Sequence, residues 1–439
     1  MKTQLRNESG QILVILAFAM VALLGITALA VDGSMVLNDR REDQSTADSA
    51  ALAGGGAAVQ LMKDFMPQDF YCGSSLGAHA SVAAVQAAQN TALADNVALV
   101  QNNPDTGVVV TCGSDVFRKY LDIKVTVTTD AKTTFAKILS RDTIRTKVES
   151  TVRVYPKQTI AFGNALATVG NSCGYGVGGI DLIGGASVTA VQGGIFSNSC
   201  IKGPNNSAFN MLGGGNVTYY GSYTFQGTVT GGSVVQSPEP LPELVIPDNP
   251  CQNPPALADY KKINDEGTFT PGYYLGFTAP KKTGAKLNPG LYCIKGDITA
   301  LGGGIITGNK VTIYMMDGNI NFAANSIINL TAPDCATPDA LCGVPPAIRG
   351  IVIYFNPAYQ RTLSFAPGNT SYFEGTILGP TTTVSLQGNA DPDAVHSQII
   401  ANNYYSNGNT NLTINLNGAE TYQNPAETYQ NPSSLEILK

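Results

Sequence analysis

An uncharged apolar run near the N-terminus constrains the fold of this chain more than any other feature. Residues 12–31 hold no charged side chain, and at helical rise they span roughly 30 Å, the thickness of the hydrocarbon core of a bilayer. The run therefore predicts a membrane-spanning helix. The side chains that we expect to face the bilayer are Ile12, Leu13, Val14, Leu16, Phe18, Val21, Leu24, Ile26, Leu29 and Val31.

The residues that flank this run predict how it crosses the membrane. Lys2 and Arg6 precede it, against the single acid Glu8, so the positive-inside rule places the N-terminus in the cytoplasm. We expect a single-pass protein of the cytoplasmic (inner) membrane, with the bulk of the chain exported to the periplasm or cell surface. A cleaved signal peptide is the alternative, because Ala28-Leu29-Ala30 fits a cleavage site. Signal-peptide cores usually run about 7–15 residues, which favours a retained anchor.

Composition limits the structural class and the partners that we expect for the exported part. The chain has 439 residues, a net charge of −6 and only 13% charged residues, and it contains 47 glycines. The charge gives no reason to expect nucleic acid as a partner. Low charge without low hydrophobicity favours close-packed β structure with many turns over disorder. The length is sufficient for two or three domains.

The eight cysteines all lie in the part that we expect to be exported, where disulfides persist. No C-x-x-C spacing occurs, which disfavours redox and zinc sites. Eight cysteines allow 105 connectivities, so spacing alone does not determine the pairing. Closure of local loops favours the pairs Cys72–Cys112, Cys173–Cys200, Cys251–Cys293 and Cys335–Cys342.

Patterning divides the N-terminal third into two segments. Residues 1–62 read as a cytoplasmic start, the anchor and an Ala-rich helical stalk. Small residues between Thr46 and Gly54 either let another helix approach closely or simply favour helix formation. Residues 63–160 read as a small α+β neck module, with a helix over 81–90 and alternating strands such as 146–155.

The remainder predicts an all-β domain over residues 161–418. Between Gly163 and Gln236, 18 of 74 residues are glycine and only Asp181 and Lys202 are charged. Short β-prone pieces separated by Gly or Asn turns cannot bury a face alone, but stacked coils of a solenoid can. We therefore expect a right-handed parallel β-helix, with a β-sandwich as the alternative.

Two segments of this C-terminal part stand apart. Residues 237–257 carry seven prolines and predict an extended linker or a long excursion from the solenoid. Residues 419–439 repeat Ala-Glu-Thr-Tyr-Gln-Asn-Pro in tandem, which predicts a disordered tail.

The first sixty residues carry four short motifs in a fixed order. They are Gly10-Gln11, Ala30-Val31-Asp32-Gly33, Asp39-Arg40-Arg41 and Ala47-Asp48-Ser49-Ala50-Ala51-Leu52-Ala53-Gly54. This combination resembles the N-terminal region of TadG-like Flp pilus-assembly proteins. The resemblance implies a membrane-anchored, non-enzymatic accessory or assembly protein of a Flp/Tad-type pilus system, with a surface or adhesive solenoid and other pilus components as partners through the N-terminal helix.

Two departures from the patterns of related systems limit what the resemblance implies. Type IV pilins carry Glu five residues after the cleavage-site glycine, and the corresponding position after Gly10 is Ile15, so we expect no prepilin processing. Many TadG-like proteins also carry a metal-binding Asp-x-Ser-x-Ser motif. Asp32-Gly33-Ser34-Met35-Val36 supplies only its first two ligand types, and we interpret Asp32 as a helix flank.

Parallel β-helices often host polysaccharide lyases and hydrolases, so catalysis needs a direct test. Hydrolysis requires a pair of carboxylates at a defined separation. The acids of the β domain are scattered, and His79 and His396 lack partners at ligand spacing. We therefore expect no catalytic residue, cofactor or metal. The alternative function is a membrane-tethered carbohydrate-binding or carbohydrate-cleaving β-helix. The acids considered are Asp297, Asp317, Asp334, Asp339, Glu374, Asp391 and Asp393.

Overall fold

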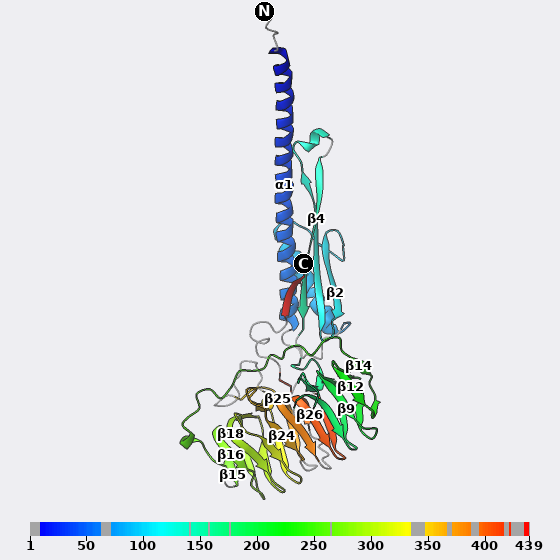
Figure 1. Ribbon diagram of the computed structural model, residues 1–439. Helices are drawn as coiled ribbons and strands as arrows, with labels where there is room; N and C mark the ends of the chain where they lie inside the picture. Colours follow the sequence, from blue (N-terminus) through cyan, green and yellow to red (C-terminus); the bar gives the residue numbers. More distant parts are fainter. Residues whose placement is uncertain are drawn as a thin grey trace, which may run out of the picture.

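The computed structural model describes residues 9–62, 72–139, 142–156, 159–174, 177–263, 266–334, 347–366, 371–387, 395–416, 421–422 and 434–438. A long helix and a small sheet form a neck, and a much larger β region lies beyond it, crosswise to the helix (Figure 1).

The helix α1 (Ser9–Met62) is a single element of 54 residues, about 80 Å long at helical rise. It has two environments along its length. From Leu13 to Val31 nearly every side chain is exposed, and this part stands clear of the rest of the chain (Figure 1). From Asp43 to Met62 one face is buried in the neck. The apolar stretch is long and apolar enough to cross a membrane, and none of it is buried inside the protein.

The neck surrounds the second half of α1. The helix α2 (Ser75–Ala94) packs against it, and a five-stranded sheet in the order β1-β2-β3-β4-β28 covers the pair. β2–β3, β3–β4 and β4–β28 are antiparallel, and β1–β2 is parallel. The strands are β1 (Val100–Gln101), β2 (Gly107–Ser114), β3 (Lys119–Lys132), β4 (Thr143–Tyr155) and β28 (Ser434–Leu438), with a short 3-10 helix η2 (Ala136–Leu139) between β3 and β4.

The β region contains one sheet of 23 strands in which every pairing described is parallel. Its first half is formed by β5 (Asn164–Thr168), β6 (Gly179–Ile183), β7 (Ser187–Ala190), β8 (Gly194–Ser197), β9 (Cys200–Gly203), β10 (Ala208–Met211), β11 (Val217–Tyr219), β12 (Ser222–Phe225), β13 (Thr228–Thr230) and β14 (Val234–Gln236). Each strand from β5 to β11 pairs with the one three elements later, 17–30 residues further along the chain.

The second half begins after a 3-10 turn, η3 (Leu257–Asp259). Its strands are β15 (Gly267–Phe269), β16 (Gly272–Thr278), β17 (Ala285–Leu287), β18 (Gly290–Ala300), β19 (Ile305–Gly308), β20 (Val311–Met315), β21 (Ile320–Phe322), β22 (Ile327–Thr331), β23 (Ile351–Phe355), β24 (Thr362–Phe365), β25 (Tyr372–Gln387), β26 (Val395–Asn407) and β27 (Asn411–Asn415). Parallel pairing excludes the antiparallel β-sandwich that we considered as the alternative.

The spatial order of the strands differs from their order in the chain. One row of register partners crosses the whole region and begins in the second half of the chain. It continues from Ile400 of β26 to Ala167 of β5, so the first half is stacked on the end of the second half. The row is Tyr273, Cys293, Tyr314, Tyr354, Leu378, Ile400, Ala167, Phe196, Thr218 and Val235.

This order requires a long connection, which residues 237–257 provide. β14 ends at one extremity of the stack and β15 begins near the other, and the green segment runs between them along the side that faces the neck (Figure 1). Leu241 N–H donates to Asn198 Oδ1 at 2.7 Å, and Tyr354 Oη donates to the Pro247 carbonyl at 2.7 Å. The proline-rich excursion is therefore an ordered strap, and it covers the largely apolar row described above.

The prediction of a disordered tail is wrong for two described pieces of it. Tyr422, within the first heptapeptide, is buried with Ile351 and Leu378, and its N–H donates to Thr376 Oγ1 at 3.0 Å. Residues 434–438 form β28, which pairs with the otherwise open edge of β4. A free strand edge thus binds β28, which follows the repeat, and a gap in an apolar cluster is filled by Tyr422 of the repeat itself. The second heptapeptide lies outside the described residues.

Candidate functional site

The residues that we predicted to face the bilayer lie on the free part of α1. From Leu13 to Leu29 the large ones are 53–76% exposed, which in water is an unfavourable surface for so many apolar side chains. Ile12 belongs to the helix, but its side chain lies outside the described residues. Asp32, directly after the run, is the first buried residue among the described side chains of the helix, and the residues on either side of it are exposed.

Asp32 joins the helix to the far end of the neck sheet. Its carboxylate accepts hydrogen bonds from the backbone N–H groups of Thr134, Phe135 and Ala136, at 2.6–3.1 Å. These three groups lie where β3 ends and η2 begins. The interpretation of Asp32 as a helix flank is therefore incomplete, because the side chain holds a loop that is a hundred residues away in sequence.

The electrostatics of this contact favour an ionised carboxylate. Burial alone raises the pKa of the Asp32 carboxyl, but the amide groups of Thr134, Ala136 and Phe135 outweigh it and hold the pKa below its ordinary value. A carboxylate that accepts several backbone N–H groups resembles the anion sites at helix N-termini. Asp32 thus occupies this site from within the chain.

Two further polar side chains of α1, Asp43 and Thr46, also bind the helix to the neck. Asp43 Oδ2 accepts from the hydroxyls of Thr129 on β3 and Thr146 on β4, at 2.5 and 2.9 Å. Thr46 Oγ1 donates to Asp95 Oδ2, just after α2, at 2.9 Å. Asp32, Asp43 and Thr46 therefore fix the register of the neck along the helix.

The small residues after Thr46 provide close packing within the chain. Ala47, Ala51 and Ala58 of α1 and Ala80, Ala84, Ala88 and Ala92 of α2 are all fully buried in one cluster. A Cβ built on Gly54 would lie 2.9 Å from the Ala84 carbonyl oxygen and 3.1 Å from Ile123 Cγ2. The helix that approaches this face is therefore α2 of the same chain, which leaves the apolar part of α1 as the segment available to other helices.

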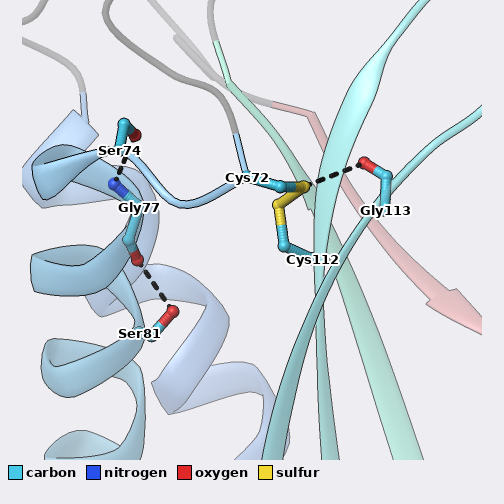
Figure 2. The surroundings of a disulfide bond; sticks show 6 residues. All are labelled: Cys72, Ser74, Gly77, Ser81, Cys112 and Gly113. Atoms are coloured by element: carbon cyan, nitrogen blue, oxygen red, sulfur yellow. Dashed lines mark hydrogen bonds between the residues drawn. A yellow bond between two sulfur atoms is a disulfide. The ribbon is translucent and has the colours of Figure 1, made fainter.

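Three disulfides connect pairs that loop closure favoured. They are Cys72–Cys112 in the neck, and Cys173–Cys200 and Cys251–Cys293 in the β region. Figure 2 shows Cys72 just before α2, bonded to Cys112 of β2, while Ser74 Oγ caps the helix by accepting from Gly77 N–H at 3.0 Å. The fourth predicted pair, Cys335–Cys342, lies outside the described residues.

A cluster of aromatic rings marks the junction between the neck and the β region. Phe117, at the turn between β2 and β3, contacts Phe162 and Phe196, with ring centroids 6.0 and 5.6 Å apart. A cavity of about 460 Å³ lies beside them, bordered by Gly214 and Ser237. Its described lining has no acidic, basic or histidine side chain, so it offers apolar contact and hydrogen bonds from the backbone and from neutral side chains such as Asn216 and Gln236.

The acids considered for catalysis have structural partners where they are described. Asp317 Oδ1 accepts from Gly296 N–H and Asp297 Oδ1 from Asn319 N–H, both at 2.8 Å. Asp334 pairs with Lys310 at 2.7 Å, and Glu374 accepts from Tyr372 Oη at 3.0 Å. Asp339, Asp391 and Asp393 lie outside the described residues.

The two histidines lie far apart in the fold. His79 is exposed on α2, whereas His396 of β26 stacks against Tyr372 with ring centroids 4.7 Å apart. Within the described ranges, no group of three His, Cys, Asp or Glu side chains is arranged to hold a metal ion.

One pattern escaped the sequence reasoning. Gly73-Ser74-Ser75-Leu76-Gly77 fits the G-x-S-x-G pattern of the nucleophile elbow, in which a serine stands on a sharp turn from strand to helix. Here Ser75 begins a helix after the turn at Cys72 and Gly73, and its neighbour Ser74 is the N-cap. The spacing is explained by helix capping.

Comparison with known proteins identifies only the N-terminal segment. Residues 10–59 match the family model described as "Putative Flp pilus-assembly TadE/G-like". No curated protein and no solved structure matches the chain. The matched range contains the free apolar part of α1, Asp32, Asp43 and the small residues that contact α2. The resemblance is thus confirmed, and residues 10–59 form a TadE/G-like Flp pilus-assembly region.

Proposed function

We propose that this protein is a single-pass accessory or assembly protein of a Flp/Tad-type pilus system. The observation that carries the proposal is the division of α1 within the matched segment. One part exposes an uncharged and almost wholly apolar surface, and the next part lies in the core of a folded neck. A helix with these two environments suits a protein that is held in a membrane and presents a domain beside it. The N-terminus lies in the cytoplasm, and the neck and β region are exported.

In this proposal the β region is a right-handed parallel β-helix that serves as a surface or adhesive body. The regular parallel pairing and the uninterrupted row from Tyr273 to Val235 support a solenoid. Corners with positive φ, such as Gly214 at 80° and Gly303 at 83°, are typical of its turns. The neck joins the β region near its middle, so two wings extend on either side (Figure 1).

The proposal includes no enzymatic activity. Its support is the engagement of Asp297, Asp317 and Glu374 in hydrogen bonds and of Asp334 in an ion pair within the stack. A hydrolase needs two carboxylates facing each other across a bound sugar.

A second function, binding of carbohydrate, is favoured by one groove of the β region. A hollow of about 410 Å³ has a mostly apolar lining, to which Leu287 and Pro289 belong. Amide and hydroxyl side chains of successive coils also border it, among them Asn288, Thr307, Asn329 and Thr331. Asn329 Oδ1 is buried and has no hydrogen-bond partner among the described residues. Amide and hydroxyl groups in a shallow groove match the hydroxyls of a glycan. A glycan array on the purified protein distinguishes the two functions, because an adhesive for protein surfaces gives no sugar-specific signal.

Membrane anchoring is tested with a matched pair of substitutions on α1. Leu24 and Leu37 are 70% and 58% exposed, but only Leu24 lies inside the apolar run. A lysine at the centre of a spanning helix costs about 2.5–3.5 kcal/mol. We expect Leu24→Lys to shift the protein into the supernatant of an alkaline carbonate extraction, and Leu37→Lys to leave it in the pellet. Equal behaviour of the two variants would contradict a spanning role.

The pilus role requires a separate experiment in the native host. Deletion of the gene is expected to abolish or reduce Flp pili, and the wild-type chain should restore them. Restoration by a chain that lacks residues 10–59 would contradict a role for the matched segment in the pilus system.

A further inference from the structure

We propose that the tip of the β3–β4 hairpin, formed by Thr133–Leu139 together with Ile144, is a second membrane contact. It rests in the headgroup layer of the leaflet from which α1 emerges. The inference relies on the anchoring role of α1 proposed above. Its occupant is lipid, with Phe135 at the boundary of the acyl chains and basic side chains among the phosphates.

The position of the tip follows from its bonds to α1. Asp32 comes directly after the last residue of the apolar run, and its carboxylate holds the backbone of Thr134, Phe135 and Ala136. Met35 Sδ lies 3.8 Å from Thr134 Oγ1, which places the tip about one helical turn beyond the run. One turn is about 5 Å along the axis, and the headgroup layer is about 5–7 Å thick. When α1 spans the bilayer, the tip lies within that layer.

The exposed side chains of the tip suit this layer better than water. Phe135 and Ile144 are each 41% exposed, although both lie next to well-packed strands. The Lys137 side chain is 70% exposed and lies 3.8 Å from Asp142 in an exposed ion pair. Aromatic side chains are enriched at the membrane interface, and long basic side chains reach from it toward the phosphates.

The charge of the hairpin also supports a position of its tip in the headgroup layer. Residues 130–145 contain four basic and two acidic side chains, within a protein whose net charge is −6. The exposed ion pair between Arg145 and Asp130 lies on the side of the tip that points away from the bilayer. The segment as a whole therefore keeps an excess of two basic residues over acidic ones. A basic segment near a bilayer gains about 1 kcal/mol per residue from anionic lipids.

Two membrane contacts, α1 and the hairpin tip, restrain the orientation of the protein in a way that α1 alone does not. A single spanning helix can rotate about its axis and tilt. A hairpin tip bonded to α1 at Asp32 and seated in the same leaflet restrains both motions. The β region would then keep a defined orientation relative to the membrane surface.

The absence of tryptophan from the chain permits a direct test. The variant Phe135→Trp places a sole indole fluorophore at the tip, and Val116→Trp places one at the opposite end of β3, where Val116 is 48% exposed. The 14 residues of β3 separate the two positions by about 45 Å. Each full-length variant is reconstituted into vesicles of phosphatidylcholine and phosphatidylglycerol, with and without lipids brominated near the headgroup.

We expect brominated lipid to reduce the indole emission of Phe135→Trp by roughly half or more and to leave that of Val116→Trp unchanged, because bromine quenches only fluorophores at its own depth. Addition of Lys137→Glu to Phe135→Trp should weaken the quenching in anionic vesicles.

One combination of results overturns the proposal. In it, aqueous iodide quenches the indole of Phe135→Trp as strongly as that of Val116→Trp, and brominated lipid does not quench it. In the same experiment, carbonate extraction leaves the protein in the vesicles. Release by carbonate would instead remove the anchor itself, and this inference with it.

Discussion

The neck and the β region are stabilised by different kinds of interaction. The neck joins α1 to its sheet through specific polar contacts, such as Asp32 with the hairpin tip and Asp43 with Thr129. Partly exposed ion pairs such as Arg153–Asp122, at 2.7 Å, reinforce its outer face. The β region instead repeats rows of apolar side chains, such as Ile313, Ile353 and Ile377, from coil to coil.

This difference fits the roles that we propose for the two regions. A neck must be fixed at one height and one angle on the helix, and polar bonds with narrow geometry provide that specificity. A stack only needs each coil to fit the next, which apolar rows achieve at any length. We therefore expect changes in one region to leave the other folded.

Removal of one disulfide in each region gives the largest expected effect and tests this independence. Cys251–Cys293 and Cys72–Cys112 close loops of similar size, with sequence separations of 42 and 40. Loop-closure entropy predicts a loss of about 4 kcal/mol for replacement of either pair by alanine. Scanning calorimetry should show only the β-region transition lowered in the first variant and only the neck transition in the second. Equal lowering of both transitions would mean that the two regions unfold as one unit.

Two glycines one half-turn apart on α1 test how closely the neck is packed. Gly54→Ala is expected to destabilise the neck by about 2 kcal/mol, because its Cβ meets the Ala84 carbonyl and Ile123. Gly56→Ala should stabilise it by about 1 kcal/mol, since nothing lies within 4 Å and alanine favours a helix. Chemical denaturation followed by circular dichroism measures both. The packing argument fails if the two variants shift stability in the same direction.

The smallest and most local effect concerns pH at Asp32. The folded pKa of this carboxyl lies below 3.8, its ordinary value, so the unfolded state binds a proton more readily than the folded state. The attachment of the hairpin tip is therefore complete above about pH 4 and is lost as the pH falls through the lower, folded pKa. Amide hydrogen exchange at Phe135 and Ala136 should report this loss.

Asp32→Asn serves as the control for that measurement. It should expose the same amides at neutral pH and remove their dependence on pH, while amides in the middle of β3 keep their protection. Unchanged protection of Phe135 and Ala136 in this variant would contradict the role of Asp32.

Much of the chain's organisation could be predicted from local patterns. The apolar helix and strands of the β region follow from periodicity and turn residues within short windows. Closure of local loops favoured the three observed disulfides, although spacing alone did not determine them. The partners of Asp32 could not be predicted in this way, because Thr134 is 102 residues distant and no local pattern links them. The order in the tail could not be predicted for a related reason. It depends on the open edge of β4 and on the apolar cluster that surrounds Tyr422.

The stacking order of the β region was also beyond the reach of pattern analysis. Both halves consist of β-strands joined by Gly or Asn turns, and these local patterns do not reveal which half is stacked on the other. Only the pairing of β26 with β5 establishes the order, and it joins Ile400 to Ala167.

That pairing has a consequence for the time at which the protein can fold. The bond from Gln398 Nε2 to the Asn164 carbonyl, at 2.6 Å, spans 234 residues. A ribosome releases β5 long before β26, and a chain is made at about 5–20 residues per second. The early coils from β5 to β14 therefore wait more than ten seconds with one edge unpaired. During that interval the unpaired edge needs protection from aggregation, by a chaperone or by passage through the membrane in an unfolded state.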